Sequence, residues 1–230
     1  AIIIMERGSK HILEQKKILE KNPHKKNEAI PNRNIKCNLK AYQFANFISV
    51  ASQHVKESFL LHQYPENRIF VNPYGVDLSM FKPLPNIPKK YDVIMVGGWG
   101  YEKGCDLIVE AIRKTNYSFI HVGSIKDVDF PQEKNFTHID PVDQSKLIEY
   151  YNQAKVFILP SRQDGFGMVL SQALACNLPI IGSNNCGAPD LKKMVELPEY
   201  ITIIKDYTAD AIVTAIHTAI KNYEQLGERI

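Results

Sequence analysis

From residue 91 onward, short apolar runs alternate with segments whose apolar residues recur at helical spacing. Such alternation is typical of a parallel sheet whose strands are connected by helices. The apolar runs predict strands at residues 92–96, 118–122, 136–139, 156–159, 179–182 and 201–204. The helical patterns predict helices at residues 106–114, 144–153, 167–175 and 208–223. The predicted fold class is therefore α/β, with a Rossmann-like parallel sheet.

The residues before position 91 follow a less regular pattern. Ser9 and Ser52 are suitable helix caps. Helices are predicted at residues 9–21, 34–45 and 52–64, and strands at residues 47–50 and 68–71. The chain starts at Ala1 and continues at once into the apolar run 2–4, which predicts a buried strand. We therefore expect that further sequence precedes Ala1.

A proline-rich stretch separates these two parts of the sequence. Its four prolines are Pro73, Pro83, Pro85 and Pro88. We predict a partial second Rossmann-like domain, the remnant of an amino-terminal domain, at residues 1–72, a linker at residues 73–90, a Rossmann-like domain at residues 91–207 and a closing helix at residues 208–230.

Composition and charge narrow the classes of partner. The 230 residues are 44% hydrophobic, enough for one large or two small globular domains. Residues 1–40 hold ten of the 28 Lys and Arg residues but only four of the 25 Asp and Glu residues. This local basicity favours either a solvated face or a peripheral contact with an anionic membrane surface. Because no stacking aromatics accompany it, we expect no nucleic-acid partner.

The four cysteines lie far apart and show no CxxC spacing, which favours reduced thiols in a cytoplasmic protein. They are Cys37, Cys105, Cys176 and Cys186. No apolar run approaches the roughly 20 residues of a membrane span. We therefore expect a cytoplasmic protein, with the inner face of the membrane as the one candidate surface. No His and carboxylate spacing indicates a metal site.

Two loops of the predicted sheet carry candidate chemistry. Parallel sheets bind ligands beyond the carboxyl ends of their strands. In the loop 97–104, glycines let the backbone approach a ligand, and Lys103 precedes a helix, which suits a phosphate; the same glycines also suit a plain turn. In the loop 160–167, Asp164 stands ahead of a helix start whose free amides face an anion. That carboxylate serves either to accept hydrogen bonds from sugar hydroxyls or to cap the helix.

A third loop, residues 183–190, is small, polar and turn-prone. It either closes over a ligand or forms a plain surface loop.

Three passages together resemble the retaining glycosyltransferases of family 4, which have the GT-B fold of two Rossmann-like domains facing a cleft. The passages are Asn72-Pro73-Tyr74-Gly75-Val76-Asp77 with Phe81 and Pro83, the loop 97–104, and Leu159-Pro160-Ser161 leading into Asp164-Gly165-Phe166-Gly167. The resemblance covers residues 44–220. Residues 6–11, Glu-Arg-Gly-Ser-Lys-His, resemble an acceptor-domain segment of a bacterial subgroup.

The resemblance implies roles for particular residues. Lys103 would bind the donor diphosphate, whereas the arginine expected nearby is replaced by Gly98 and Trp99, with Arg162 as a substitute. Two family glutamates, eight positions apart, become Asp164 on the donor sugar and Gln172 on the ribose. The other implied donor-binding residues are Gly97, Gly98, Phe166, Gly167, Met168, Val169, Gly187 and Asp190. The loops 123–124 and 140–142 would border the base.

The resemblance also implies the reaction. A sugar would pass from a nucleotide-diphosphate sugar to a glycan or lipid-linked acceptor with retention of configuration, in glycan or polysaccharide biosynthesis, without a metal or cofactor. Because most of the acceptor domain is absent, we expect this chain alone to bind the donor but to transfer poorly. The alternative is a non-catalytic nucleotide-sugar-binding or scaffold protein, motivated by the missing arginine and by Gln172. A sugar-nucleotide epimerase would need acid and base residues that the sequence does not supply.

Overall fold

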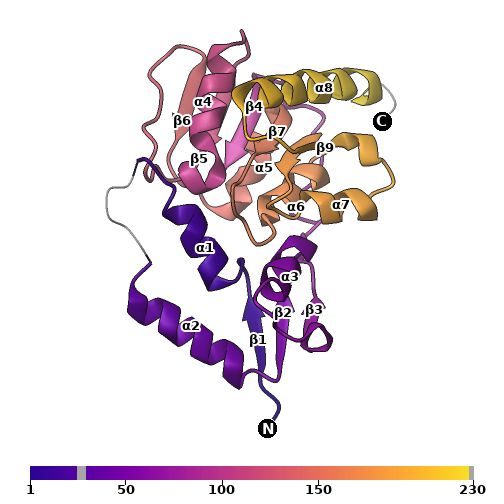
Figure 1. Ribbon diagram of the computed structural model, residues 1–230. Helices are drawn as coiled ribbons and strands as arrows, with labels where there is room; N and C mark the ends of the chain where they lie inside the picture. The colour runs from indigo at the N-terminus through magenta and orange to yellow at the C-terminus, as the bar shows by residue number, and fades with distance from the viewer. Residues whose placement is uncertain (25–29, 228–230) are drawn as a thin grey trace.

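The computed structural model describes residues 1–24 and 30–227, which form two parallel sheets of different size (Figure 1). The larger sheet has the order β6-β5-β4-β7-β8-β9. Its strands are β4 (Tyr91–Val96), β5 (Phe119–Val122), β6 (Phe136–Ile139), β7 (Ala154–Leu159), β8 (Ile180–Ser183) and β9 (Ile201–Ile204). Its helices are α4 (Cys105–Arg113), α5 (Gln144–Asn152), α6 (Met168–Ala175), α7 (Ala188–Met194) and α8 (Ala209–Gly227). The predicted α/β class with parallel strands is confirmed.

The smaller sheet has the order β1-β2-β3, and its strands are also parallel. They are β1 (Ile4–Arg7), β2 (Phe47–Val50) and β3 (Ile69–Val71), with helices α1 (Ile12–Leu19), α2 (Asn32–Phe44) and α3 (Gln53–Leu60). We call residues 1–71 the small unit and residues 91–227 the large unit. Each has its own cluster of buried apolar residues. The segment 72–90 between them contains no helix or strand, yet its Phe81 is buried against Tyr151 of the large unit.

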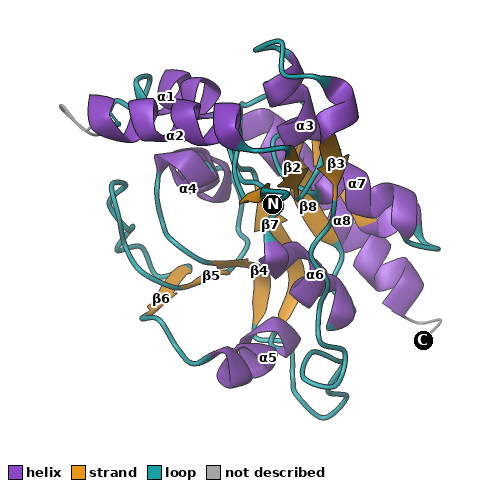
Figure 2. Cartoon of the chain, turned by 90° about the horizontal axis from the view of Figure 1, so that it is seen from below, coloured by secondary structure: helices purple, strands orange, loops and turns teal. Residues whose placement is uncertain are grey.

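The order of strands in the large unit creates a crevice. From β4 the chain proceeds through β5 to β6 at one edge, and then crosses through α5 to β7 on the other side of β4. Because such crossovers are right-handed, the reversal places α4 on one face of the sheet and α5 and α6 on the other (Figure 2). The final helix, α8, packs against α4. The loops that leave β4 and β7 therefore diverge at their carboxyl ends, where open sheets bind ligands.

Burial explains why these strands were readable in the sequence. All but a few residues of β4, β5, β7 and β8 are buried, because helices cover both faces of the sheet. Helix α8 buries its apolar face on α4 and β9. That face consists of Ile212, Ala215, Ile216, Ala219 and Ile220.

The start of the chain differs from the prediction. Ile2, Ile3 and Ile4 are 74%, 52% and 58% exposed, so the expectation of a buried strand at residues 2–4 was wrong. Strand β1 begins only at Ile4 and, within the part of the chain that the structure describes, pairs with β2 on one side alone. Helix α1 likewise begins after His11 and not after Ser9; the His11 Nδ1 accepts a hydrogen bond from Leu13 N.

The third loop was also predicted incompletely. Ser183 still belongs to β8, residues 184–187 form a turn, and α7 begins at Ala188, within the stretch expected to be loop. The end of the predicted closing helix, residues 228–230, lies outside the described residues.

The two units are joined by hydrogen bonds between loops. Ser52 lies at the N-cap position of α3, but its Oγ donates to the Gly165 carbonyl at 2.5 Å instead of capping the helix. The approach is so close that a Cβ on Gly165 would lie 1.8 Å from the Gly8 carbonyl oxygen. Only glycine therefore fits at position 165 in this arrangement.

Candidate functional site

The loops after β4 and β7 meet at the crevice of the large unit. The amides of Arg162 and Gln163 donate to the Glu102 carbonyl at 2.9 and 3.3 Å. Gly104 makes this approach possible: its φ is 75°, and a Cβ there would lie 2.4 Å from the Pro160 carbonyl oxygen. Two segments about 60 residues apart in sequence thus form one surface.

Lys103 and Asp164 come together on that surface. The Lys103 Nζ donates to the Asp164 Oδ2 at 2.5 Å, and both side chains are about one-fifth exposed. An ammonium group has three N–H donors, so Lys103 can hold Asp164 and still bind an anion. The structure thus places two residues of the predicted site in direct contact.

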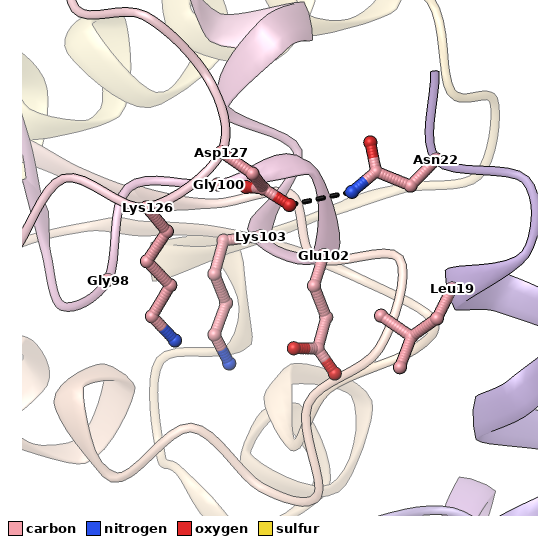
Figure 3. A pocket seen from close by; sticks show the side chains of 8 residues that line it. All are labelled: Leu19, Asn22, Gly98, Gly100, Glu102, Lys103, Lys126 and Asp127. Atoms are coloured by element: carbon pink, nitrogen blue, oxygen red, sulfur yellow. Dashed lines mark hydrogen bonds between the residues drawn. The ribbon is translucent and has the colours of Figure 1, made fainter. Parts of the chain in front are cut away.

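A cavity of about 200 Å³ lies beside Lys103, between the large unit and the end of α1 (Figure 3). It is bordered by Gly98, Glu102 and, from the loop after β5, Lys126. At its rim, Asn22 of the small unit donates through its Nδ2 to the Asp127 Oδ2 at 2.6 Å. The other lining residues are Leu19, Gly100 and Lys103.

The acid in this cavity is electrostatically coupled to its lysines. Burial raises the pKa of the Glu102 carboxyl, while the positive charges of Lys103 and Lys126 oppose that rise. No pattern in the sequence indicated a role for Glu102, Lys126 or Asn22. The only signal for Lys126 was its position shortly after a predicted strand of the sheet, at the same edge as Lys103.

The start of α6 forms another part of the crevice. Gly167 occupies the N-cap position without a side-chain cap, so the first amides of the helix have no partner within it. Asp164 does not cap α6; its Oδ1 accepts from the Phe166 amide at 3.3 Å. Met168 is 47% exposed and Val169 is half-buried, whereas the Phe166 side chain is fully buried and leaves only its backbone for a ligand. This arrangement suits a bound anion.

Arg162 faces away from the cavity beside Lys103. Its guanidinium binds both carboxylate oxygens of Asp106 at 2.6 and 2.7 Å and stacks 3.8 Å from the centre of the Tyr101 ring. It borders a second cavity, of about 410 Å³, together with Lys10 and Asn185. The predicted substitute for the missing arginine is therefore engaged with an acid of its own.

Gln172 and Asp190 are both buried and hydrogen-bonded. The Gln172 Oε1 accepts from the Tyr151 hydroxyl at 2.9 Å within the large unit. The Asp190 Oδ2 accepts from the amide of Gln53, the first residue of α3 in the small unit, at 2.9 Å. Gly187, whose amide donates to the Phe166 carbonyl, packs directly on Phe166. In this arrangement the end of the third loop contacts the small unit.

A buried histidine contacts the backbone of the loop 97–104. His121 of β5 is fully buried, and burial lowers its pKa to about 4, so its ring is neutral at pH 7. Its Nε2 lies 2.8 Å from the Gly97 carbonyl oxygen and its Nδ1 lies 3.0 Å from the His138 Nδ1. The sequence analysis did not find this contact, because it depends on the pairing of β5 with β4 and β6.

Residues 1–24 and 30–227 contain neither a cluster of metal-ligating side chains nor a membrane-spanning helix. No group of three or more His, Cys, Asp or Glu side chains in these ranges is arranged to hold a metal ion. None of the helices in the same ranges is long and apolar enough to cross a membrane. The cysteines Cys37, Cys105, Cys176 and Cys186 all carry free thiols.

The sequence match and the fold together define the class of protein. Residues 78–230 match the family described as glycosyl transferases group 1. Because this match covers more than half of the chain, the protein belongs to that family. Its two parallel-sheet units are those of the GT-B fold, which is shared by the solved glycosyltransferases that it resembles.

Individual relatives are more distant. The chain is 25% identical over 216 residues to a probable sucrose-phosphate synthase of Thermosipho melanesiensis, a match that covers 82% of this chain and 50% of that protein. The chain thus spans half of this curated relative. HepE from Anabaena, solved in complex with UDP and glucose, matches with a TM-score of 0.73 at 15% identity, over 97% of this chain and 63% of HepE. WaaG, a glycosyltransferase involved in lipopolysaccharide biosynthesis, matches with a TM-score of 0.71 at 16% identity. The match covers 99% of this chain and 71% of WaaG.

Proposed function

We propose that this chain is the donor-binding part of a retaining glycosyltransferase of family 4, which transfers a sugar from a nucleotide-diphosphate sugar to an acceptor. The observation that carries the proposal is the meeting of Lys103, Asp164 and the uncapped start of α6 at the crevice of the large unit. Membership in the glycosyl transferases group 1 family supports it. HepE, which shares the fold, was solved in complex with UDP-glucose.

The proposed mechanism depends on charge. As the bond to the donor sugar breaks, negative charge develops on the leaving diphosphate, and Lys103 with the α6 amides of Met168 and Val169 would stabilise it. Asp164 would accept hydrogen bonds from the sugar hydroxyls and orient the sugar. Transfer with retention would follow a front-face route with oxocarbenium character. Because the protein supplies the cations, we propose that no metal is required, and a chelator should leave the rate unchanged.

The cavity beside Lys103 is smaller than the whole proposed donor. Ligand pockets usually enclose about 300–1,000 Å³, whereas this cavity encloses about 200 Å³. Its volume suits the diphosphate part alone. We therefore expect the small unit to move when a complete nucleotide sugar binds, which would break the hydrogen bonds from Asn22 to Asp127 and from Ser52 to Gly165.

The acceptor and the location of the protein are parts of the same proposal. We propose a glycan or lipid-linked acceptor in glycan or polysaccharide biosynthesis, and the fold shared with WaaG supports this pathway. The site of action would be the cytoplasm, at the inner face of the membrane. The described part of the basic segment 1–40 supports a peripheral contact, because Arg33, Lys36 and Lys40 are exposed along α2.

One observation favours a second candidate, a non-catalytic nucleotide-sugar-binding or scaffold protein. Gln172, assigned to the ribose by resemblance, is buried and already accepts a hydrogen bond from Tyr151. A glutamine also lacks the charge that strengthens a hydrogen bond to a ribose hydroxyl. A protein that only binds the donor would tolerate this loss.

Calorimetric titration of the chain with UDP, GDP, ADP and their glucose conjugates tests the proposed donor site. We expect saturable binding of one nucleotide, weakened roughly 10- to 100-fold in Lys103→Ala because one charge-assisted contact is lost. Lys134→Ala is the matched control. Lys134 is exposed and precedes β6, so it lies at the amino ends of the strands, whereas Lys103 lies at their carboxyl ends. The absence of saturable binding by any of these ligands would contradict the proposal.

A transfer assay on a protein that carries the complete acceptor domain separates the two candidates. The enzyme releases nucleoside diphosphate in step with a glycosylated product whose anomeric configuration, read by NMR, matches that of the donor. Binding without product supports the non-catalytic candidate, and an inverted product would contradict the retaining assignment.

A further inference from the structure

The cavity beside Lys103 contains a second lysine, which comes from a different loop. Lys126 follows β5, and its amino group lies next to that of Lys103, with both side chains extending in the same direction (Figure 3). Lys103 is paired with Asp164, whereas no ion pair found among the described residues involves Lys126. Lys126 thus brings a second positive charge to this cavity, beside the carboxyl of Glu102 and without a direct ion pair among the described residues.

Backbone hydrogen bonds hold Lys126 in register with the glycine loop. The pairing of β4 with β5 continues past the strand ends, because the Trp99 amide donates to the Ser124 carbonyl at 2.8 Å and the Lys126 amide donates to the Trp99 carbonyl at 2.9 Å. Trp99 is fully buried and packs on Phe119 and His121. The position of Lys126 is therefore set by the core of the large unit, even though its side chain is exposed.

Gly98 provides the space that Lys126 occupies. A Cβ on Gly98 would lie 2.4 Å from the Lys126 Cε and 2.9 Å from its Nζ. The φ angle of Gly98 does not lie in the positive region, so its backbone conformation does not require glycine. The atoms that a larger residue at position 98 would meet first are those of the lysine side chain lying across it.

A diphosphate requires more than one cation at this place. At neutral pH it carries at least two negative charges, and the one lysine of the glycine loop already shares its charge with Asp164. The uncapped start of α6 adds only about half of a charge. Arg162 does not line this cavity; its guanidinium binds Asp106 and borders the second cavity.

We propose that Lys126 is the second cation of the diphosphate site and occupies, from the loop after β5, the position that a basic side chain at residue 98 would otherwise fill. The inference rests on the proposed donor site and adds a residue to it. Lys126 would bind the phosphate oxygens on the side of the cavity that faces Gly98, while Lys103 binds those that face Asp164. The two lysines together would neutralise the leaving group.

The first test uses inorganic pyrophosphate, which does not depend on the identity of the base. Calorimetry should show pyrophosphate binding to the chain, weakened roughly tenfold in Lys126→Met, because the side chain keeps its length and loses one charge-assisted hydrogen bond. Lys126→Arg should retain most of the affinity, and Lys134→Met, at the amino ends of the strands, all of it. Thermal unfolding curves of each variant establish that it is folded.

The second test moves the cation from one loop to the other. Lys126→Ala should weaken pyrophosphate binding, and Gly98→Arg in the same chain should restore it, because the arginine enters the space that the lysine leaves. One result would overturn the role of Lys126 and leave the donor site intact. In that result Lys126→Met binds pyrophosphate as tightly as the wild type does, while Lys103→Ala binds it weakly. If the wild-type chain binds neither pyrophosphate nor any of UDP, GDP and ADP, the proposed function fails together with this inference.

Discussion

The segments that follow β7 and β8 lie side by side, and each carries an aspartate that the family resemblance assigns to the donor, Asp164 in a loop and Asp190 in the first turn of α7. Asp164, after β7, pairs with Lys103 in the crevice of the large unit. Asp190, after β8, is buried and accepts a hydrogen bond from the first amide of α3 in the small unit. The same residue type on neighbouring loops thus has two environments, one open to a ligand and one that joins the two units.

The difference arises from what lies opposite each loop. The loop after β7 faces Lys103, because Gly104 lets the loop after β4 approach it closely. The first turn of α7 faces the start of α3, whose positive helix end attracts the Asp190 carboxylate. An acidic residue at the carboxyl ends of the strands therefore lies near the donor crevice. The group that it contacts decides whether it binds a ligand or another part of the protein.

The largest expected effect in this comparison is that of Asp164→Ala on donor affinity. We expect the affinity for the complete nucleotide sugar to fall roughly 10- to 100-fold, because the hydrogen bonds of a charged group to the sugar are lost. The free nucleoside diphosphate should be affected less, since it has no sugar for Asp164 to contact. Calorimetry with both ligands measures the difference, and equal losses for the two would show that Asp164 acts by positioning Lys103 and not by contacting the sugar.

Lowering the pH should reduce the free energy of unfolding, because His121, which contacts the loop 97–104, is buried in its neutral form. Burial lowers the pKa of His121 to about 4, below its unfolded value of 6.5, so the unfolded chain binds more protons between these values. Stability is therefore complete above pH 6.5 and falls as pH decreases towards 4, by up to about 1.4 kcal/mol per pH unit for this residue. His11 and His54, whose pKa values are also lowered to about 4, act in the same direction.

Urea unfolding at pH 7 and pH 5 measures this loss. The His121→Gln variant should show a weaker dependence on pH than the wild type, because glutamine does not titrate in this range. An identical dependence in the two proteins would show that His121 is not a source of the acid sensitivity.

The smallest expected effect is that of Asp190 substitutions, and it should appear in stability. Asp190→Ala removes the hydrogen bond to the Gln53 amide and should lower the free energy of unfolding by about 1 kcal/mol, the usual contribution of a side chain at a helix start. Asp190→Asn keeps an acceptor oxygen and should lower it less. Chemical denaturation provides these values. A larger loss of nucleoside diphosphate affinity in Asp190→Ala than in Lys103→Ala would reverse the comparison.

The sequence was most informative where both faces of an element are buried. The strands of the larger sheet follow from continuous apolar runs, and Lys103 follows from its place after a glycine-rich strand end. The exposure of residues 2–4 could not be predicted, because an apolar run in a sequence does not show whether another element packs on it. Helix α7 was hidden by the glycine and proline at its start.

The side-chain contacts of the site were harder to predict than its position. The pairing of Arg162 with Asp106 joins residues 56 positions apart, and no local pattern indicates it. Lys126 reaches the cavity only because Trp99 aligns two loops beyond the ends of their strands. Such contacts depend on the packing of loops against each other, which one sequence read along its length does not display.

A crystal structure of the chain with the tightest-binding nucleoside diphosphate is the most direct test of the central claim. We expect both phosphates between β4 and β7, within hydrogen-bond distance of the Lys103 Nζ and of the first amides of α6, with Lys126 on the side of Gly98. A nucleotide bound elsewhere on the protein, with no density between these two loops, would contradict the account.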